Sequence, residues 1–115
     1  MTALIESLQL VEVDIAMNGE QALERYKEIG HQGKKYLMIL MDIFMPVMGG
    51  HESTQKIREI EKEWELPRTP IIGCSSSTDD NTTKKCMDVG MDELQAKPIS
   101  RSNLEAIISR ELGRL

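Results

Sequence analysis

The sequence predicts a doubly wound α/β fold, in which helices cover both faces of a parallel β-sheet. Short apolar segments alternate with amphipathic segments along most of the 115 residues. The connections between them are short, and no internal repeat or linker interrupts the order. Such alternation indicates parallel strands joined by helical crossovers. A chain of this length has room for one hydrophobic core, so we expect a single domain.

The first half of the chain contains two expected strands and one expected helix. Val11–Ala16 alternates apolar and acidic residues, as in a strand with one less buried face. Asn18 and Gly19 interrupt the chain, and Glu20–Ile29 then carries apolar residues on one helical side. The apolar run Tyr36–Met41 is bounded by turn residues, which predicts a strand buried on both faces.

The second half supplies three helices and two strands in alternation. Two prolines end the first of these helices, because proline restricts the backbone at its own position and at the preceding one. Asp79 to Asn81 can cap the second helix, and Gly90 can stop it. In order, the expected elements are a helix over His51–Glu63, a strand over Ile71–Ser75, a helix running to Val89, a strand over Glu93–Ala96 and a helix over Arg101–Leu112.

The bulk composition excludes several classes of function. A formal net charge of −5 argues against a general nucleic-acid binder, because nothing would balance the repulsion of the phosphates. No apolar run approaches the roughly 20 residues that span a bilayer, and the N-terminus lacks the basic region of a signal peptide. The two cysteines, Cys74 and Cys86, fit no metal-binding spacing and are expected to be reduced packing residues. We therefore expect a cytoplasmic domain with no membrane contact of its own.

Three chemically distinct side chains stand where predicted strands end: Asp42, Ser75 and Lys97. Each alone has a structural explanation, as a turn former, a structural hydroxyl or a surface charge. Ligand sites of doubly wound sheets lie beyond the carboxyl ends of the strands, so the three are expected to converge. A carboxylate nucleophile, a hydroxyl donor and a cation are the groups needed to accept and hold a phosphoryl group.

Three segments carry a family resemblance. LMDIFMPVMGG, TPIIGCSS and CMDVGMDELQAKPI resemble, in order and spacing, the signature segments of response-regulator receiver domains. The resemblance covers about residues 10–112 and implies a flavodoxin-like form of the α/β fold. The stretch IREIEKEWELPRTPII is most similar to receivers attached to hybrid sensor histidine kinases. By this resemblance Asp42 is the phosphoacceptor, and Ser75 and Lys97 contact the phosphoryl group.

The resemblance also implies roles for residues around the phosphoacceptor. Asp42 and the backbone carbonyl of Phe44 would be ligands of a Mg²⁺ ion. The bond between Lys97 and Pro98 would be cis, an accessible isomer for an X-Pro bond, and would hold the lysine ammonium toward Asp42. The loop after the phosphoacceptor would be shaped by glycines, whose backbone angles other residues avoid, and by two further residues. These loop positions are Met45, Pro46, Gly49 and Gly50.

The chain departs from the family pattern at its N-terminus. ALIESLQL matches the second half of the family's first helix, so residues 1–115 are expected to form a single receiver domain that lacks the first strand and its acidic pair. Asp14 is no substitute, because its side chain would project away from the site. Mg²⁺ binding should be weakened, since the ion prefers octahedral ligation by carboxylates, waters and phosphate. The gap would be explained by a fragment of a longer chain, by a second copy that completes the sheet in a homodimer, or by recruitment of the N-terminal residues.

A second departure concerns the switch position. The family usually carries an aromatic residue three positions before the lysine, and this chain has Leu94 there. Leucine has no amphipathic ring, so the aromatic half of the coupled switch is lost. Elsewhere, Trp64 is expected to be a local packing residue. His31 is expected on a turn and His51 at a helix start, and the sequence assigns a role to neither.

Two functions from different classes follow. In the first, Asp42 accepts a phosphoryl group from a phosphohistidine on a histidine kinase or a histidine phosphotransfer protein, and a conformational change relays the signal. Its chemistry would extend no further than self-catalysed phosphotransfer and autodephosphorylation, so we do not expect an enzyme. In the second, a degenerate receiver binds partner proteins without being phosphorylated. A phosphatase of the haloacid dehalogenase type is disfavoured, because Phe44 stands where a second Asp would be needed. Nucleotide binding is disfavoured too, because no glycine-rich phosphate loop follows any strand.

Overall fold

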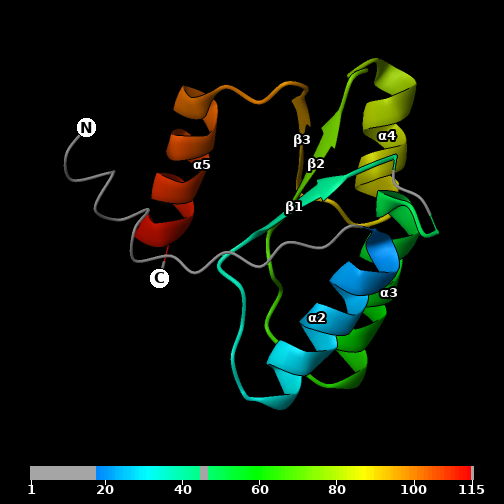
Figure 1. Cartoon of the computed structure of the whole chain (residues 1–115), viewed down its shortest axis with the longest axis vertical. Coiled ribbons are helices and arrows are strands. Elements are labelled where there is room, and N and C mark those ends of the chain that lie inside the picture. The colour runs from blue at the N-terminus through cyan, green and yellow to red at the C-terminus, as the bar shows by residue number, and fades with distance from the viewer. Residues whose placement is uncertain (1–17, 45–46, 115) are drawn as a thin grey trace.

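The computed structural model describes residues 18–44 and 47–114, which form alternating helices and strands (Figure 1). The strand expected over Val11–Ala16 and the loop residues Met45 and Pro46 lie outside the described residues. Within them the elements are α2 (Gly19–His31), β1 (Ile39–Asp42), α3 (Gly50–Glu63), β2 (Ile71–Ser75), α4 (Asp80–Asp88), β3 (Glu93–Ala96) and α5 (Arg101–Gly113).

The described strands form one parallel sheet in the order β1-β2-β3. Ile39 lies opposite Ile71 in the β1–β2 ladder, and Ile72 lies opposite Glu93 in the β2–β3 ladder. Figure 1 shows α5 on one side of the sheet and α2, α3 and α4 on the other. The doubly wound α/β architecture is therefore confirmed, and the parallel order places the carboxyl ends of all three strands at one edge.

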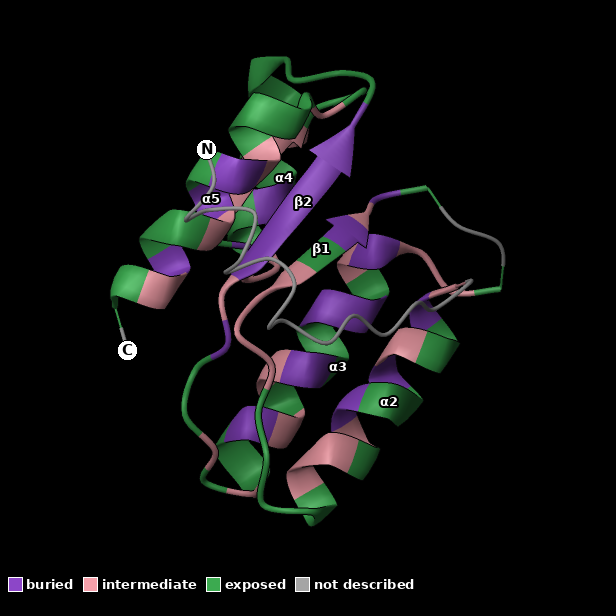
Figure 2. Cartoon of the chain, turned by 60° about the vertical axis from the view of Figure 1, so that its left-hand side comes forward, coloured by how far each residue is buried: buried purple, intermediate pink, exposed green. Residues whose placement is uncertain are grey.

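The core is centred on β2. All five residues of β2 are buried, and Figure 2 shows this strand buried along its length beside the less buried β1. Ile57 of α3 and Ile71 of β2 are fully buried, and Met41 of β1 joins the same cluster. Full burial on both faces explains why Ile71–Ser75 has no polar alternation, and its predicted bounds are confirmed.

The prediction for the first described strand was wrong in two respects. The strand begins at Ile39 rather than Tyr36, and it includes Asp42 as its last residue. Leu40 is 42% exposed, so the strand is not buried on both faces. Its side chain lines an open hollow together with Asp42, Cys74 and the residues that follow β3, and no helix of the described part of the chain lines it. His31 was also misplaced, since it is the last residue of α2 rather than part of a turn.

A buried ionic network ties α2 and α3 to the amino end of the sheet. Glu61 of α3 accepts hydrogen bonds from Tyr26 Oη at 3.1 Å, from the Thr69 amide at 2.8 Å and from Arg58 at 2.8 Å. Arg58 also forms an ion pair with Asp92 at 2.8 Å, just before β3. Burial, first of all, and the neighbouring Glu61 carboxylate raise the pKa of Tyr26 to about 12. This network fixes the end of the sheet opposite Asp42.

Candidate functional site

The structure gathers the three predicted site residues at the carboxyl edge of the sheet. Asp42 is the last residue of β1, Ser75 is the last residue of β2, and Lys97 follows β3 directly. Asp42 lies opposite Cys74 in the ladder, and the Lys97 amide donates to the Ser75 carbonyl at 2.8 Å. The site is therefore built on the ends of rigid strands.

Asp42 and Lys97 are in direct contact. The Lys97 ammonium forms a hydrogen-bonded ion pair with Asp42 Oδ2, and the Phe44 amide donates to Oδ1 at 3.2 Å. The Asp42 side chain is 36% exposed and that of Lys97 is 41% exposed, so a large phosphoryl donor can reach both side chains. The Lys97–Pro98 peptide bond is cis, the isomer that the resemblance led us to expect.

Ser75 makes no hydrogen bond to Asp42 or Lys97 through its side chain within the described residues. It is buried, and its Oγ accepts a hydrogen bond from the Ser77 amide at 3.1 Å. Ser77 Oγ in turn donates to Asp79 Oδ2 at 3.0 Å, and Asp79 Oδ1 caps α4 by accepting from the Thr82 amide at 2.7 Å. Hydrogen bonds from Thr82 lower the pKa of Asp79. A chain of hydrogen bonds thus connects the site hydroxyl with the amino end of α4.

The loop after Asp42 approaches the strand closely through glycine. The Gly50 amide donates to the Ile43 carbonyl at 2.9 Å, and a Cβ atom on Gly50 would collide with the carbonyl group of Asp42. Gly50 is needed for this approach rather than for an unusual φ angle. Val47 instead takes the left-handed conformation, with φ of 68°, and Phe44 is 77% exposed beside the site.

An open hollow of about 620 Å³ adjoins Asp42 and Lys97, and no local sequence pattern predicts it. Its other lining residues are Leu40, Cys74, Pro98 and Ile99. Burial, reinforced by the Asp42 carboxylate, raises the pKa of the Cys74 thiol, so the thiol stays protonated at neutral pH. Only the spatial arrangement of three strand ends reveals that these residues share one surface.

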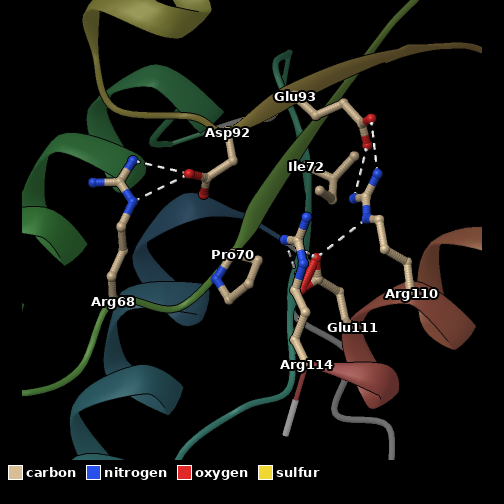
Figure 3. A pocket seen from close by; sticks show the side chains of 8 residues that line it. All are labelled: Arg68, Pro70, Ile72, Asp92, Glu93, Arg110, Glu111 and Arg114. Carbon is tan, nitrogen blue, oxygen red and sulfur yellow. Dashed lines mark hydrogen bonds and ion pairs between the residues drawn. The ribbon is translucent and has the colours of Figure 1, made fainter.

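A second hollow, of about 270 Å³, lies toward the other end of the sheet (Figure 3). Three arginines line it, and each is paired with a carboxylate. Arg68 pairs with Asp92, and Glu111 accepts from both Arg110 and Arg114. Because the positive charges are compensated within the hollow, we assign it a structural role.

The described residues do not make up a complete Mg²⁺ site. They contain no group of three or more His, Cys, Asp or Glu side chains arranged to hold a metal ion. Asp42 is the site carboxylate, and Lys97 and the Phe44 amide already engage its two oxygens. Mg²⁺ needs several oxygen ligands in octahedral geometry, so a single carboxylate and one candidate carbonyl, that of Phe44, fall short.

The switch position lies at the edge of the core. Leu94 of β3 is half-buried and packs against the core cluster, opposite Gly73 in the ladder. Both cysteines are free and buried. The Trp64 ring packs against the His31 ring at a tilt of 39°, with ring centroids 4.5 Å apart. In the part of the chain that the structure describes, no helix has the length and apolar character that crossing a bilayer requires.

Comparison with known proteins gives one consistent result. Residues 1–109 match the family described as Response regulator receiver domain. The chain is 38% identical over 109 residues to hybrid signal transduction histidine kinase L of Dictyostelium discoideum, covering 93% of this chain and 6% of that protein. It is 35% identical over 98 residues to the osmosensing histidine protein kinase SLN1 of Saccharomyces cerevisiae, covering 84% of this chain and 8% of that protein. The chain thus spans a small part of the length of these two relatives.

A solved structure agrees with these relatives. The receiver domain of sensor histidine kinase PA1611 from Pseudomonas aeruginosa, which holds a magnesium ion in its active-site cleft, superposes with a TM-score of 0.75. The two chains are 29% identical, and the match covers 97% of this chain and 84% of that one.

Proposed function

We infer the function of this chain from one premise, that it belongs to the response regulator receiver domain family. We propose that Asp42 accepts a phosphoryl group from a phosphohistidine and that the chain relays the signal by a conformational change. The observation that carries this proposal is the ion pair between Asp42 and Lys97, which joins the carboxyl ends of β1 and β3. It combines a nucleophile with a fixed cation at the edge where such sheets bind ligands.

The proposed transfer is a displacement at phosphorus. A carboxylate oxygen of Asp42 forms the new P–O bond as the P–N bond of the phosphohistidine breaks, and the departing imidazole nitrogen takes up a proton. Lys97 moves from the carboxylate toward an oxygen of the transferred group, so its charge stabilises the charge there. The Phe44 amide, which donates to Oδ1 at 3.2 Å, orients the carboxylate. The chemistry is limited to this transfer and to hydrolysis of the acyl phosphate.

The partners of this proposal are a histidine kinase or a histidine phosphotransfer protein on the cytoplasmic side of the membrane. Mg²⁺ is the cofactor expected from the family, and it would lessen repulsion between carboxylate and phosphate. Because the described residues supply only one carboxylate, we propose that binding is weak, and the steps above use Asp42 and Lys97 alone.

A second candidate is a receiver that serves as an interaction module without phosphorylation. Leu94, which has no aromatic ring, favours it, as does the incomplete set of metal ligands. Within the described residues, β1 pairs on one edge only, and Leu40 of that strand is exposed. A second copy could complete the sheet there, in a homodimer of the single receiver domain formed by residues 1–115.

Beryllofluoride, an analogue of a phosphoryl group, distinguishes the two candidates. Adding it with Mg²⁺ to the isotope-labelled chain should shift the amide resonances of residues 42–44, 75–77 and 97. The shifts should vanish in Asp42→Asn, which lacks the ionised carboxylate, and persist in the control Asp88→Asn, which changes an exposed acid on α4. Equal spectra with and without beryllofluoride in the unmodified chain would favour the interaction module.

A further inference from the structure

We propose that the contact between His51 of α3 and Cys86 of α4 is a latch that couples the Asp42 loop to α4. When Asp42 carries a phosphoryl group, the latch transmits the movement of the loop to α4. Protonation of His51 breaks the contact with Cys86 and so opens the latch. This inference rests on the proposed function for its trigger, whereas its pH dependence stands on the contact alone.

The first link joins Asp42 to the start of α3. Gly50, the first residue of α3, packs so tightly on the Asp42 carbonyl that no side chain fits between them. Its amide is bonded to the Ile43 carbonyl at 2.9 Å. Ser53, in the same helical turn, donates to the Gly19 carbonyl at 2.8 Å and is fully buried. A shift of the Asp42 backbone must therefore be passed to the first turn of α3.

The second link joins α3 to α4. His51 Nε2 lies 3.4 Å from Cys86 Sγ, across 35 residues of sequence. Cys86 is fully buried in the core cluster and is the one fully buried side chain among the residues of α4. Helix α4 thus has a single deep anchor, and the imidazole that touches it sits one residue from the Asp42 contact.

The electrostatics of the pair favour its neutral form. Burial, with help from the Lys85 ammonium of α4, lowers the pKa of His51, and burial raises the pKa of Cys86. The neutral thiol can then donate to the imidazole Nε2. The groups that face the imidazole are the Cys86 thiol, the Lys85 ammonium and the positive end of the α3 dipole, so an imidazolium would be repelled there.

The sign of the pH dependence follows from this. His51 binds a proton more weakly in the folded chain than in the unfolded one, so its stabilising contact is fully present above the unfolded pKa of about 6.5. The contact is lost as pH falls through the lowered folded pKa. Helix α4 should loosen in mildly acidic solution, while α5, which lies on the other side of the sheet, should not.

The latch gives the chain a route to α4 that does not need an aromatic residue at Leu94. The other route on the structure runs from Ser75 through Ser77 to the Asp79 cap of α4. The two routes reach α4 at different points, its amino end and its last turn. Variants at His51 therefore test the latch without touching the Ser75 route.

Hydrogen exchange of the α4 amides tests the latch in the full chain. Beryllofluoride with Mg²⁺ should change exchange over residues 82–89, and His51→Ala should reduce that change by about 2- to 10-fold, the range that a neutral hydrogen bond gives. His51→Gln, which keeps an acceptor but does not titrate, should preserve the coupling. Unchanged exchange in α5, on the other side of the sheet, shows that each variant is folded. An α4 response in His51→Ala equal to that of the unmodified chain would overturn the proposal.

A second hydrogen-exchange experiment needs no ligand, so it separates failure of the latch from failure of the proposed function. Between pH 7 and pH 5, α4 exchange corrected for intrinsic rates should accelerate in the unmodified chain and stay constant in His51→Gln. Acceleration without any beryllofluoride response near Asp42 would count against phosphorylation but support the latch. The same pH profile in both chains would refute the latch, whatever Asp42 does.

Discussion

Replacing Lys97 by alanine is expected to slow phosphoryl transfer to Asp42 by about 10²- to 10³-fold, the loss typical of removing one fixed electrostatic donor. Lys97 is the cation that contacts the Asp42 carboxylate in the described residues. Without it, the charge on the transferred oxygens would lose the compensation that the lysine ammonium provides. The measurement is the initial rate of acyl phosphate formation with a small phosphodonor.

Two further substitutions show whether the effect belongs to this contact. Lys97→Arg keeps the charge but changes its shape, so it should recover part of the rate. Lys84→Ala removes an exposed lysine from α4 and should leave the rate unchanged. Equal rates for Lys97→Ala and the unmodified chain would show that the ion pair has no part in the transfer.

Replacing Arg58 by alanine is expected to lower the free energy of unfolding by about 3–5 kcal/mol, the usual cost of breaking a buried ion pair from one side. The Arg58 side chain is 13% exposed and that of Glu61 is 8% exposed. Arg58 also donates to the carbonyls of Thr69 and Gly90, at 2.8 and 2.9 Å. Its loss would leave a buried carboxylate and two carbonyl groups short of donors, which denaturant unfolding would measure.

Arg68 supplies the matched control for this prediction. It contacts the same Asp92 carboxylate and the same Gly90 carbonyl, but its side chain is 57% exposed. Arg68→Ala should therefore cost no more than about 1 kcal/mol, as exposed ion pairs usually do. Similar losses for the two variants would mean that burial does not set the strength of this network.

Strand bounds were predictable where the sequence marks both ends. Ile71–Ser75 follows Pro70 and precedes a polar stretch, and its predicted bounds are confirmed. The strand before Asp42 was set too early because an apolar run does not show where pairing starts. The first pair of the β1–β2 ladder joins Ile39 to Ile71, the residue after Pro70. The start of β2 therefore sets the start of β1 at Ile39. That limit comes from the neighbouring strand, which no local pattern contains.

In the candidate site, too, some features could be predicted from local sequence and others depend on neighbouring elements. The strand ends of Asp42 and Lys97 could be placed from sequence, because parallel strands share one carboxyl edge. The contact of His51 with Cys86 could not, since it depends on how α3 and α4 pack across 35 residues. The partner of Ser75 was also beyond prediction, because the hydroxyl bonds the Ser77 amide two residues away rather than the carboxylate. Sequence patterns locate side chains on elements, whereas contacts between elements need the packed fold.

The most direct test of the central claim, that Asp42 is the phosphoacceptor, is to trap the acyl phosphate chemically. The chain is incubated with Mg²⁺ and acetyl phosphate, its intact mass is measured, and borohydride reduction followed by peptide mapping locates the modified residue. We predict a single added phosphoryl group, trapped at Asp42 and absent from Asp42→Asn. An unchanged mass in the native chain, or a modification that persists in Asp42→Asn, would contradict the claim.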